Sequence, residues 1–519
     1  MAVGYSFLHG ALVLLMAGLV TRILGFFYQM AMIRLIGPEG VGLFNMVFPV
    51  YIMVLVLATA GIPLAVAKLV AEEVAGNNLP GAYGILVQSI FVLVLTSLFC
   101  TCLLVCGVPL LKSCVFPNPK VYYCFVGLIP GIVIVSLCSA FRGFFQGLQQ
   151  MTPTAVTQTV EQLVRVVAGL SIACLLLPRG IEYAAVGLSL GVVLGELSGF
   201  LLMLRIFFKH RTAAVGTAVR RFPDLGLRQF LSRAYGLAVP VTLTRFVATA
   251  LMSVQAVLIP LRLHVSGLSI SQATSVYGQF VGIAETLLFI PGVLTMALAT
   301  ALVPAISDAM ALRNLRLVRE RVYDAVRLTI QVGMPAAFIF LILADELCGV
   351  LFRYPEAGVS LRIMALAGPF LYLQQTTTGI MQGMGRADIP FKNLVISSAV
   401  SLTGIYYLTA VPLLAVKGTA LAVALGFVVM SLLNLQDLHR LTGFYPGLRE
   451  HVLKPLLSVL CMSLLMLYLR GALQSRGLDE GAVLFVTLLA GGLTYLACML
   501  LSGGFNEEDK VKFKAIFRL

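Results

Sequence analysis

Three arginines lie well inside long apolar segments, where a basic side chain is unusual: Arg22, Arg165 and Arg245. A charged side chain at the centre of a bilayer costs at least about 2.5–3.5 kcal/mol on insertion scales, so it normally faces a partner or a wet cavity. The planar guanidinium group binds phosphate or carboxylate through paired hydrogen bonds. These residues therefore predict a binding site for an anionic group within a membrane, and they favour an anionic substrate over a cationic drug.

The residues around Arg22 indicate which face of its segment is polar. Helical spacing of i, i+4 and i+7 places one set of small or polar residues on a single face, namely Gly18, Arg22, Gly25 and Gln29. Arg245 stands in a shorter polar stripe between two threonines. Two explanations stay open for Arg22 and Arg245. Either they contact a substrate, or they form a salt bridge to Glu285 or Glu196 that fixes helix packing.

Glu161 precedes Arg165 by four residues, the favourable orientation for an ion pair along one helix. This pair could be purely structural or could belong to the substrate site, and the sequence leaves both readings open. Arg142 lies at the end of the preceding apolar segment, so Arg142 and Arg165 are candidates for a relay on the cytoplasmic side. The candidate substrate-binding residues are therefore Arg22, Arg245, Arg165, Arg142, Glu161, Glu285 and Gln29.

The usual signatures of catalysis are missing from the sequence. There is no Ser-His-Asp arrangement, HExxH helix, phosphate-binding Walker loop or Asp-rich metal motif, and the chain has 5 histidines. We therefore expect no catalytic residue, no bound metal and no resident cofactor, and the protein is not expected to be an enzyme. Without a nucleotide-binding loop, any energy coupling would come from Na+, H+, the membrane potential or the substrate gradient.

The elements that must position these residues are membrane-spanning helices. Of 519 residues, 60% are hydrophobic and 11% are charged, whereas a soluble domain carries about 25% charged residues. The apolar runs do not alternate, which favours helices over a β-barrel. We expect fourteen spans, near residues 6–36, 42–71, 81–111, 121–148, 153–178, 182–208, 234–261, 274–305, 324–351, 359–384, 389–413, 418–440, 452–473 and 481–502.

The basic residues indicate how the spans are oriented. The formal net charge is +14, but the basic residues flank the spans, so a nucleic-acid partner is not expected. Connections after even-numbered spans, with the C-terminal tail, hold 20 Lys and Arg, and those after odd-numbered spans hold 10. This bias predicts a multi-pass protein of the cytoplasmic membrane with both termini in the cytoplasm. Arg205 and Arg327, near the cytoplasmic ends of their spans, are expected to reach the interface.

An internal repeat divides the chain into two halves. Gly143-Phe-Phe-Gln-Gly147 closes the fourth span and Gly379-Ile-Met-Gln-Gly383 closes the tenth, 236 residues later. Two six-span halves with a substrate site between them are a common transporter arrangement. The sequence thus predicts an N-terminal lobe over residues 1–210, a basic cytoplasmic linker over 211–233, a C-terminal lobe over 234–442, and two further helices with a cytoplasmic tail over 443–519.

Three segments give the chain a family resemblance: residues 141–165 (FRGFFQGLQQMTPTAVTQTVEQLVR), residues 60–72 (AGIPLAVAKLVAE) and Arg22-Ile-Leu-Gly25. They resemble the stage V sporulation protein B family, in the polysaccharide transporter and lipid II flippase branch of the multidrug/oligosaccharidyl-lipid/polysaccharide (MOP) exporter superfamily. The resemblance implies two six-helix lobes with cavity walls from spans one, two, seven and eight. The lipid II flippases of this branch commonly carry an arginine at the position of Tyr28.

The leading hypothesis is a flippase that moves an undecaprenyl-diphosphate-linked oligosaccharide, a peptidoglycan precursor of the spore cortex, by alternating access. Arg22 and Arg245 would hold the diphosphate, and membrane lipids would surround the chain. Two alternatives remain open. One is a cation-coupled multidrug exporter of the same superfamily. The other is a non-transporting membrane scaffold that binds peptidoglycan synthesis proteins.

Overall fold

The computed structural model describes residues 2–110, 116–214, 227–445 and 447–504. In these ranges the chain is built from helices and contains no β-strand. Eleven helical segments are long and apolar enough to cross a membrane. A helix satisfies its backbone hydrogen bonds within its own segment, as the hydrocarbon interior requires. The predicted all-α membrane fold is confirmed.

The predicted number of fourteen spans differs from these eleven segments for identifiable reasons. The segment Met16–Ala75 covers two predicted spans, because α1 (Ala2–Thr59) continues through a break at Gly37 (φ 74°, ψ 170°) and is followed by α2 (Ile62–Ala75). Two other predicted spans coincide with α14 (Gly368–Gly383), which has only 16 residues, and α15 (Asp388–Leu408), which is not apolar enough. The number fourteen stays a prediction.

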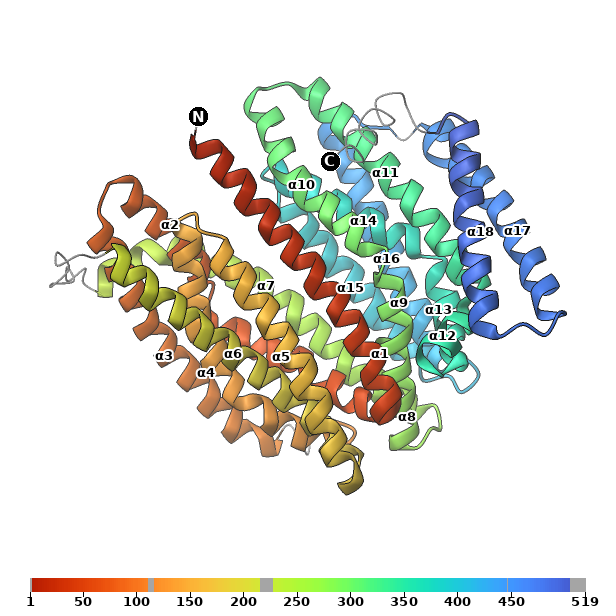
Figure 1. Cartoon of the computed structure of the whole chain (residues 1–519), viewed down its shortest axis with the longest axis horizontal. Helices are drawn as coiled ribbons and strands as arrows, with labels where there is room; N and C mark the ends of the chain where they lie inside the picture. The colour runs from red at the N-terminus through yellow and green to blue at the C-terminus, as the bar shows by residue number, and fades with distance from the viewer. Residues whose placement is uncertain (1, 111–115, 215–226, 446, 505–519) are drawn as a thin grey trace. The chain divides into compact units, whose positions relative to one another are not determined.

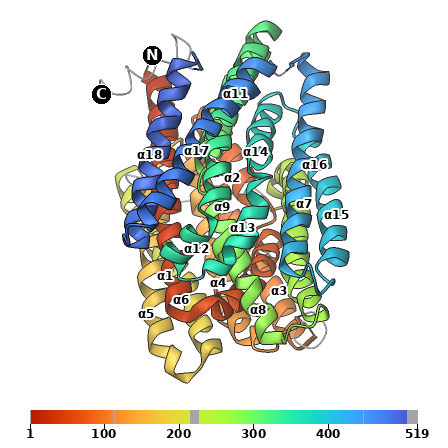
Figure 2. The same cartoon turned by 90° about the vertical axis from the view of Figure 1, so that its right-hand side faces the viewer.

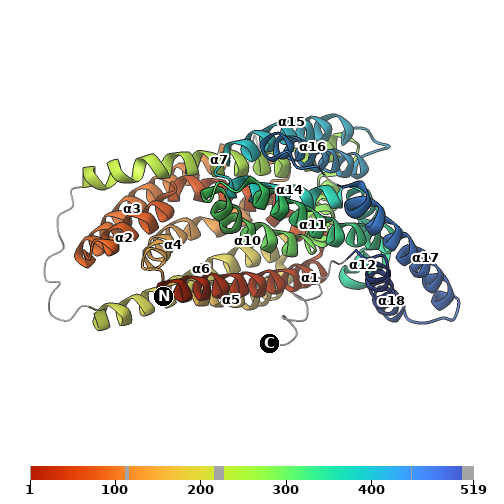
Figure 3. The same cartoon turned by 90° about the horizontal axis from the view of Figure 1, so that it is seen from above.

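The chain forms two compact units, and the first ends at Gly278. It is built around α4, α5 and α6, which pack against one another, with α1 lying along α5 (Figures 1 and 3). Besides α1 and α2 it contains α3 (Leu79–Leu110), α4 (Val121–Gly147), α5 (Thr152–Leu176), the short 3₁₀ helix η2 (Leu177–Arg179), α6 (Ile181–Ala214), α7 (Leu227–Val265) and α8 (Ile270–Gln279).

The helices α7 and α8 pack within the first unit, although the sequence repeat assigns them to the second half. Gly61 (φ 63°) approaches α7 so closely that a Cβ atom there would lie 2.5 Å from the Ala238 carbonyl oxygen. A Cβ on Gly42 would lie 2.3 Å from the carbonyl oxygen of Thr274 on α8. Packing therefore divides the chain inside the eighth predicted span, whereas the repeat divides it at the predicted linker 211–233. Residues 215–226 of that linker lie outside the described residues.

The second unit runs from Gln279 to Leu519. In it α15 packs beside α16 (Figure 3), and α17 beside α18 (Figure 2). Its elements, besides α14 and α15, are the π-helix η3 (Phe280–Glu285), α9 (Thr286–Phe289), α10 (Gly292–Ala311), α11 (Leu315–Ile342), α12 (Ala344–Phe352), the 3₁₀ helix η4 (Pro355–Ala357), α13 (Gly358–Ala365), α16 (Val416–Thr442), the π-helix η5 (Leu448–Leu453), α17 (Lys454–Gln474) and α18 (Glu480–Leu501).

The two copies of the repeated glycine motif make matching contacts in their own units. Gly143 lies against the Pro63 carbonyl oxygen on α2, and Gly379 lies against Ala299 on α10. Small residues at this spacing let two helices approach closely within a membrane. The motif that closes the fourth predicted span therefore packs on the second, and the motif that closes the tenth packs on the eighth.

The ends of these helices repeat as well. A left-handed residue terminates α2 at Asn77 (φ 56°) and α10 at Arg313 (φ 52°), and the same conformation ends α4 at Gln149 (φ 58°) and α14 at Gly385 (φ 75°). Both pairs are 236 residues apart, the offset of the glycine motif. These caps support the predicted repeat. The superposition of whole halves, and the domain boundaries drawn from it, stay predictions.

Candidate functional site

A row of glycines on α6 brings this helix directly onto α5. A Cβ atom on Gly191 would lie 2.4 Å from the Cα atom of Gly169, and one on Gly195 would lie 2.8 Å from the Glu161 carbonyl oxygen. Such distances exclude any side chain, so the two backbones can touch. The row recurs every four residues, at Gly187, Gly191, Gly195 and Gly199. Glu196, next to Gly195, is thereby held beside the charged residues of α5.

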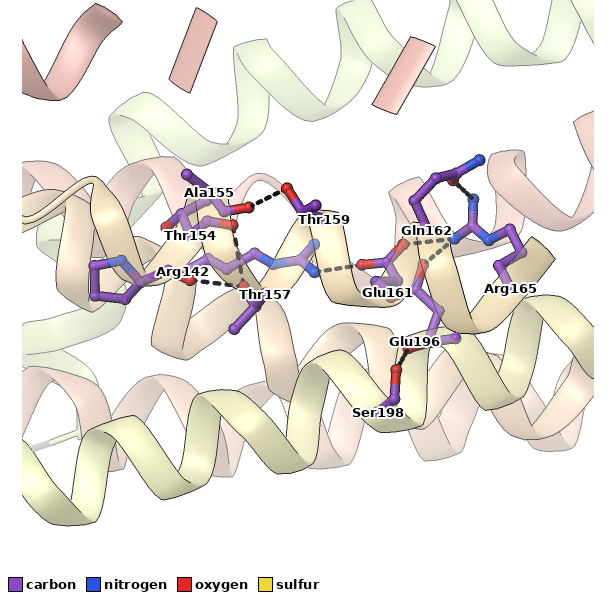
Figure 4. A network of polar contacts seen from close by, with 12 residues as sticks. Arg142, Thr154, Ala155, Thr157, Thr159, Glu161, Gln162, Arg165, Glu196 and Ser198 are labelled. Atoms are coloured by element: carbon purple, nitrogen blue, oxygen red, sulfur yellow. Dashed lines mark hydrogen bonds and ion pairs between the residues drawn. The ribbon is translucent and has the colours of Figure 1, made fainter. Parts of the chain in front are cut away.

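Four charged side chains from α4, α5 and α6 form one connected cluster (Figure 4). Arg142 Nη2 donates to Glu161 Oε2 at 2.7 Å, and Arg165 Nη2 donates to Glu161 Oε1 at 2.5 Å. The same Nη2 atom of Arg165 reaches Glu196 Oε1 at 3.1 Å. We call Arg142, Glu161, Arg165 and Glu196 the charged cluster.

The charged cluster lies inside the first unit and is formally neutral. Glu161 is 8% exposed and Glu196 is 9% exposed. Burying an ion costs several kcal/mol unless a partner of opposite charge and further hydrogen bonds compensate it. Two arginines and two glutamates supply the opposite charges, but the hydrogen bonding is incomplete. In the described part of the chain, Arg142 Nε, Arg165 Nε and Glu196 Oε2 have no hydrogen-bond partner.

The cluster resolves part of what the sequence left open. The ion pair between Glu161 and Arg165, predicted from their spacing, is present. Glu196 pairs with Arg165, so the suggested salt bridge from Glu196 to Arg22 or Arg245 is not formed. The physical reason is the glycine row, which aligns Glu196 with α5 and not with α1 or α7.

Arg22 and Arg245 differ from the clustered arginines in both exposure and pairing. Arg22 lies on α1 and Arg245 on α7, two helices that pack together, and both residues are exposed. Within the described ranges, neither guanidinium group has an ion-pair or hydrogen-bond partner. Gly18, one turn before Arg22, has open space where a Cβ atom would be. Two unneutralised cations on packed helices are available for an anionic ligand.

The helix that carries Arg22 touches the charged cluster through a glutamine. A Cβ on Gly25 would lie 3.8 Å from Gln162 Nε2, and Gln162 Oε1 lies 3.5 Å from Arg165 Nη1. Gly25 is three residues after Arg22, on the same face of α1. The face of α1 that carries Arg22 is therefore connected to Arg165 through one intervening side chain, that of Gln162.

Glu285 and Gln29 are the two remaining candidate residues from the sequence. Glu285 ends the π-helix η3 in the second unit, is partly buried, and has no ion pair with any residue that the structure describes. Gln29 is half-buried on α1 and takes part in a contact. Glu285 belongs to the second unit and Arg22 and Arg245 to the first, so the suggested salt bridge between them stays a prediction.

Two other arginines have partners that the sequence did not suggest. Arg327 is 2% exposed and pairs with Asp324 at 3.3 Å, so the expectation that it reaches the interface was wrong. Arg233, at the start of α7, pairs with Glu72 at 3.0 Å and Glu73 at 2.7 Å on α2. The hydrogen bond to Glu73 raises the pKa of Arg233. The Arg233 pairs join segments 160 and 161 positions apart, which spacing along one helix cannot reveal. Arg327 and Asp324, in contrast, are three residues apart on α11.

No group of three or more His, Cys, Asp or Glu side chains in the described part of the chain could hold a metal ion. The charged groups of the site are arginine and glutamate side chains, which can bind groups of the opposite charge. The residue that sequence reasoning undervalued is Glu196. The sequence did contain a signal for it: glycines recur every four residues on the helix that carries Glu196, and this spacing is typical of close helix contacts in membranes.

Comparison with known proteins gives, over nearly the whole chain, the family that the sequence segments resemble. The model of the family described as "Polysaccharide biosynthesis protein" matches residues 7–310, and the model described as MatE matches residues 280–407. The chain is 31% identical over 517 residues to "Stage V sporulation protein B" of Bacillus subtilis (strain 168), with 99% of each chain covered. It is 24% identical to "Lipid II flippase MurJ" of the same organism, covering 95% of this chain and 94% of that one.

Solved structures share the fold. The inward closed conformation of lipid II flippase MurJ matches with a TM-score of 0.67 at 15% identity, covering 94% of this chain and 97% of that one. An inward-facing multidrug resistance MATE family transporter of the MOP superfamily matches with a TM-score of 0.65 at 14% identity, covering 81% and 95%. These two matches show the fold. The curated relatives and the apolar helices place the chain in the class of multi-pass membrane flippases and exporters, and not among enzymes. The chain belongs to the polysaccharide biosynthesis protein family and to the group of stage V sporulation protein B.

Proposed function

We propose that this protein moves a lipid-linked saccharide with a diphosphate group across the cytoplasmic membrane by alternating access. Arg22 and Arg245 bind the diphosphate, and Arg165 acts as the next cation on the cytoplasmic side. The carrier lipid is undecaprenol, and the saccharide is a peptidoglycan precursor used for the spore cortex. Both termini lie in the cytoplasm.

The observation that carries this proposal is that one set of arginines is paired with glutamates and another set is not. Arg142 and Arg165 are neutralised by buried glutamates. Arg22 and Arg245 are exposed and lack an ion pair among the described residues. An unneutralised arginine in a membrane span costs about 2.5–3.5 kcal/mol or more. A cost of this size is expected where the charge serves binding.

The substrate class follows from the chemistry of guanidinium groups together with the relatives. Diphosphate offers several acceptor oxygens for the two forks of Arg22 and Arg245, and its charge matches theirs. A relative that covers nearly the full length of the chain is named a lipid II flippase, and another is named for sporulation. The first name supports a lipid-linked precursor over a free sugar phosphate, and the second supports a role in sporulation.

One observation favours the alternative of a cation-coupled drug exporter. Glu285 is a partly buried carboxyl group without an ion pair in the described ranges, which is the type of residue that binds a cationic drug or a coupling Na+ ion. The two functions are distinguished by which charge matters. The diphosphate flippase depends on Arg22 and Arg245, whereas a cation exporter depends on Glu285 and tolerates neutral residues at both arginine positions.

The experiment is a flipping assay in proteoliposomes that contain a fluorescent undecaprenyl-diphosphate sugar. We expect Arg22→Ala and Arg245→Ala each to reduce the rate at least tenfold, because each removes one fork from the diphosphate. Arg205→Ala is the matched control, since Arg205 is also exposed and lies near the end of α6. It should keep the normal rate. Thermal unfolding in detergent should show that all three variants remain folded.

Full transport by the Arg22→Ala/Arg245→Ala double variant would overturn the proposal. If the double variant also still supports peptidoglycan synthesis in cells, while the purified wild type shows no flipping, the scaffold alternative is favoured. Loss of folding in either single variant would assign that arginine to structure.

A further inference from the structure

Two carboxyl groups in the charged cluster share one guanidinium nitrogen. Arg165 Nη2 lies 2.5 Å from Glu161 Oε1 and 3.1 Å from Glu196 Oε1. These two distances limit the separation of the two carboxyl oxygens to 5.6 Å at most. Two carboxylates this close in a poorly solvated place resist being ionised together.

The two glutamates are not equally compensated. Both oxygens of Glu161 accept a charged hydrogen bond, one from Arg142 and one from Arg165. Glu196 has only its share of Arg165, through Oε1. Its Oε2 atom is buried and has no partner in the described chain. Of the two carboxylates, Glu196 therefore gains more from taking up a proton.

A second observation around Glu196 points to a small hydrogen-bonding ligand. Tyr51 on α1 is 2% exposed, and its hydroxyl group has no partner in the part of the chain that the structure describes. Its oxygen lies against Gly131, where a Cβ would come within 2.6 Å of it and 3.4 Å from Val193 Cγ2. Val193 stands on α6 one turn before Glu196. Buried hydroxyl groups are rarely left without a partner. A proton held near Glu196, directly or through water, would provide one.

The titratable and charged groups that face Glu196 come from three neighbouring helices. On α4 they are Arg142 and Cys138, on α5 Glu161 and Arg165, and on α1 Tyr51, with Tyr28 facing Arg165. Arginine stays protonated at any physiological pH, and Tyr and Cys are neutral below about pH 8. Both oxygens of Glu161 already accept a hydrogen bond from an arginine. Glu196 is thus the group in this neighbourhood that can change charge.

We propose that Glu196, together with Glu161, forms a proton-binding site inside the membrane, in which Glu196 takes up and releases one proton. The step breaks no covalent bond: the Glu196 carboxylate accepts H+ from water and its contact with Arg165 ceases to be an ion pair. The formal charge of the charged cluster changes from 0 to +1. Arg165 then keeps only Glu161 as a counter-ion.

This site offers a route for coupling transport to protons, a step that rests on the proposed function. Protonation of Glu196 removes one of the two counter-ions of Arg165. Arg165 is connected through Gln162 to the face of α1 that carries Arg22. An extra positive charge there favours binding of an anionic head group. By thermodynamic reciprocity, the head group then favours protonation by the same factor.

The test of the site itself needs no substrate. Infrared difference spectra of the purified protein, recorded between about pH 5 and about pH 9, should show the C=O stretching band of a protonated carboxylic acid. This band should shift in deuterium oxide. Glu196→Gln, which keeps the size and the Oε1 acceptor, should remove that band. Glu285→Gln removes a carboxyl group that, unlike Glu196, has no ion pair among the described residues, and it should leave the band in place. Tyr51→Phe should shift its frequency, because the phenol hydroxyl group is lost.

A band that persists in Glu196→Gln, or the lack of any titrating band in the wild type, would overturn the proposal. Should Glu196→Gln fail to fold, Tyr51→Phe decides the matter, since an unshifted band means that the proton lies elsewhere. The flipping assay is a separate arm. If the band behaves as expected but the protein flips no lipid diphosphate, the proposed function fails and the proton site stands.

Discussion

Glu161 is the centre of the charged cluster, and its removal should destabilise the protein more than any other single change there. Its two oxygens accept from Arg142 at 2.7 Å and from Arg165 at 2.5 Å. Glu161→Ala leaves Arg142 without a carboxylate and leaves Arg165 with Glu196 alone. Two positive charges then share one negative charge in the interior of the first unit.

The magnitude follows from burial. Removal of one partner of a buried ion pair typically costs about 3–5 kcal/mol, because the other charge stays behind uncompensated. The side chains of Arg142 and Glu161 are 18% and 11% exposed, so screening by water is small. We expect a loss near 3 kcal/mol for Glu161→Ala. The pair Lys120–Glu182 is the matched control. It has a similar distance of 3.0 Å but side chains that are 47% and 22% exposed, so Glu182→Ala should cost about 1 kcal/mol or less.

The assay is reversible unfolding in mixed detergent micelles, combined with a double-mutant cycle of Glu161→Ala and Arg142→Met. The two changes remove partners of one contact, so their effects should be non-additive by about 1–3 kcal/mol. The double variant should be more stable than Glu161→Ala, because it no longer contains the orphaned Arg142. Strict additivity, or a Glu161→Ala cost no larger than that of Glu182→Ala, would refute the buried cluster.

Three further predictions concern the remaining fold. Gly191→Ala should lower the free energy of unfolding by about 1–3 kcal/mol through overpacking, because the new Cβ would lie 2.4 Å from Gly169 Cα. The control is Gly492→Ala on α18, where a Cβ would have no atom within 4 Å. In the same unfolding assay this control should be neutral or stabilise the protein by up to about 1 kcal/mol. Arg233→Ala should lower the free energy of unfolding by about 1–2 kcal/mol in low salt and by less in high salt. The reason is that the Arg233 side chain is 33% exposed and the change removes its pairs with two glutamates. A loss that does not depend on salt would contradict this. A reporter fused after Leu519 should be active in the cytoplasm, and activity only outside the cell would reverse the proposed orientation.

The sequence predicted those features that depend on local pattern. Apolar runs predicted the helices, the spacing of Glu161 and Arg165 predicted an ion pair that is present, and a 236-residue offset predicted a repeat that the caps at Asn77 and Arg313 support. Each of these signals lies within one helix or in two copies of the same motif. They need no knowledge of how helices are rotated against one another.

Partners from different helices could not be predicted in this way. Arg142 and Glu161 lie 19 positions apart, and Arg165 and Glu196 lie 31 positions apart. Whether such residues meet depends on the rotation and register of α4, α5 and α6, which the glycine contacts decide. For the same reason the sequence did not show that α7 and α8 pack within the first unit.

Charge balance then separates structural arginines from candidates for binding. A buried arginine that has its own glutamate, as Arg142 does, needs no ligand to explain its place in the membrane. Arg22 and Arg245 have no such partner among the described residues, so their cost must be offset by water, lipid or substrate. Arg165 stands between these two cases, because its counter-ion Glu196 is only partly satisfied. A residue whose neutralisation can be switched by one proton is well suited to respond to a ligand that Arg22 binds, and this makes Arg165 the position where binding and coupling would meet.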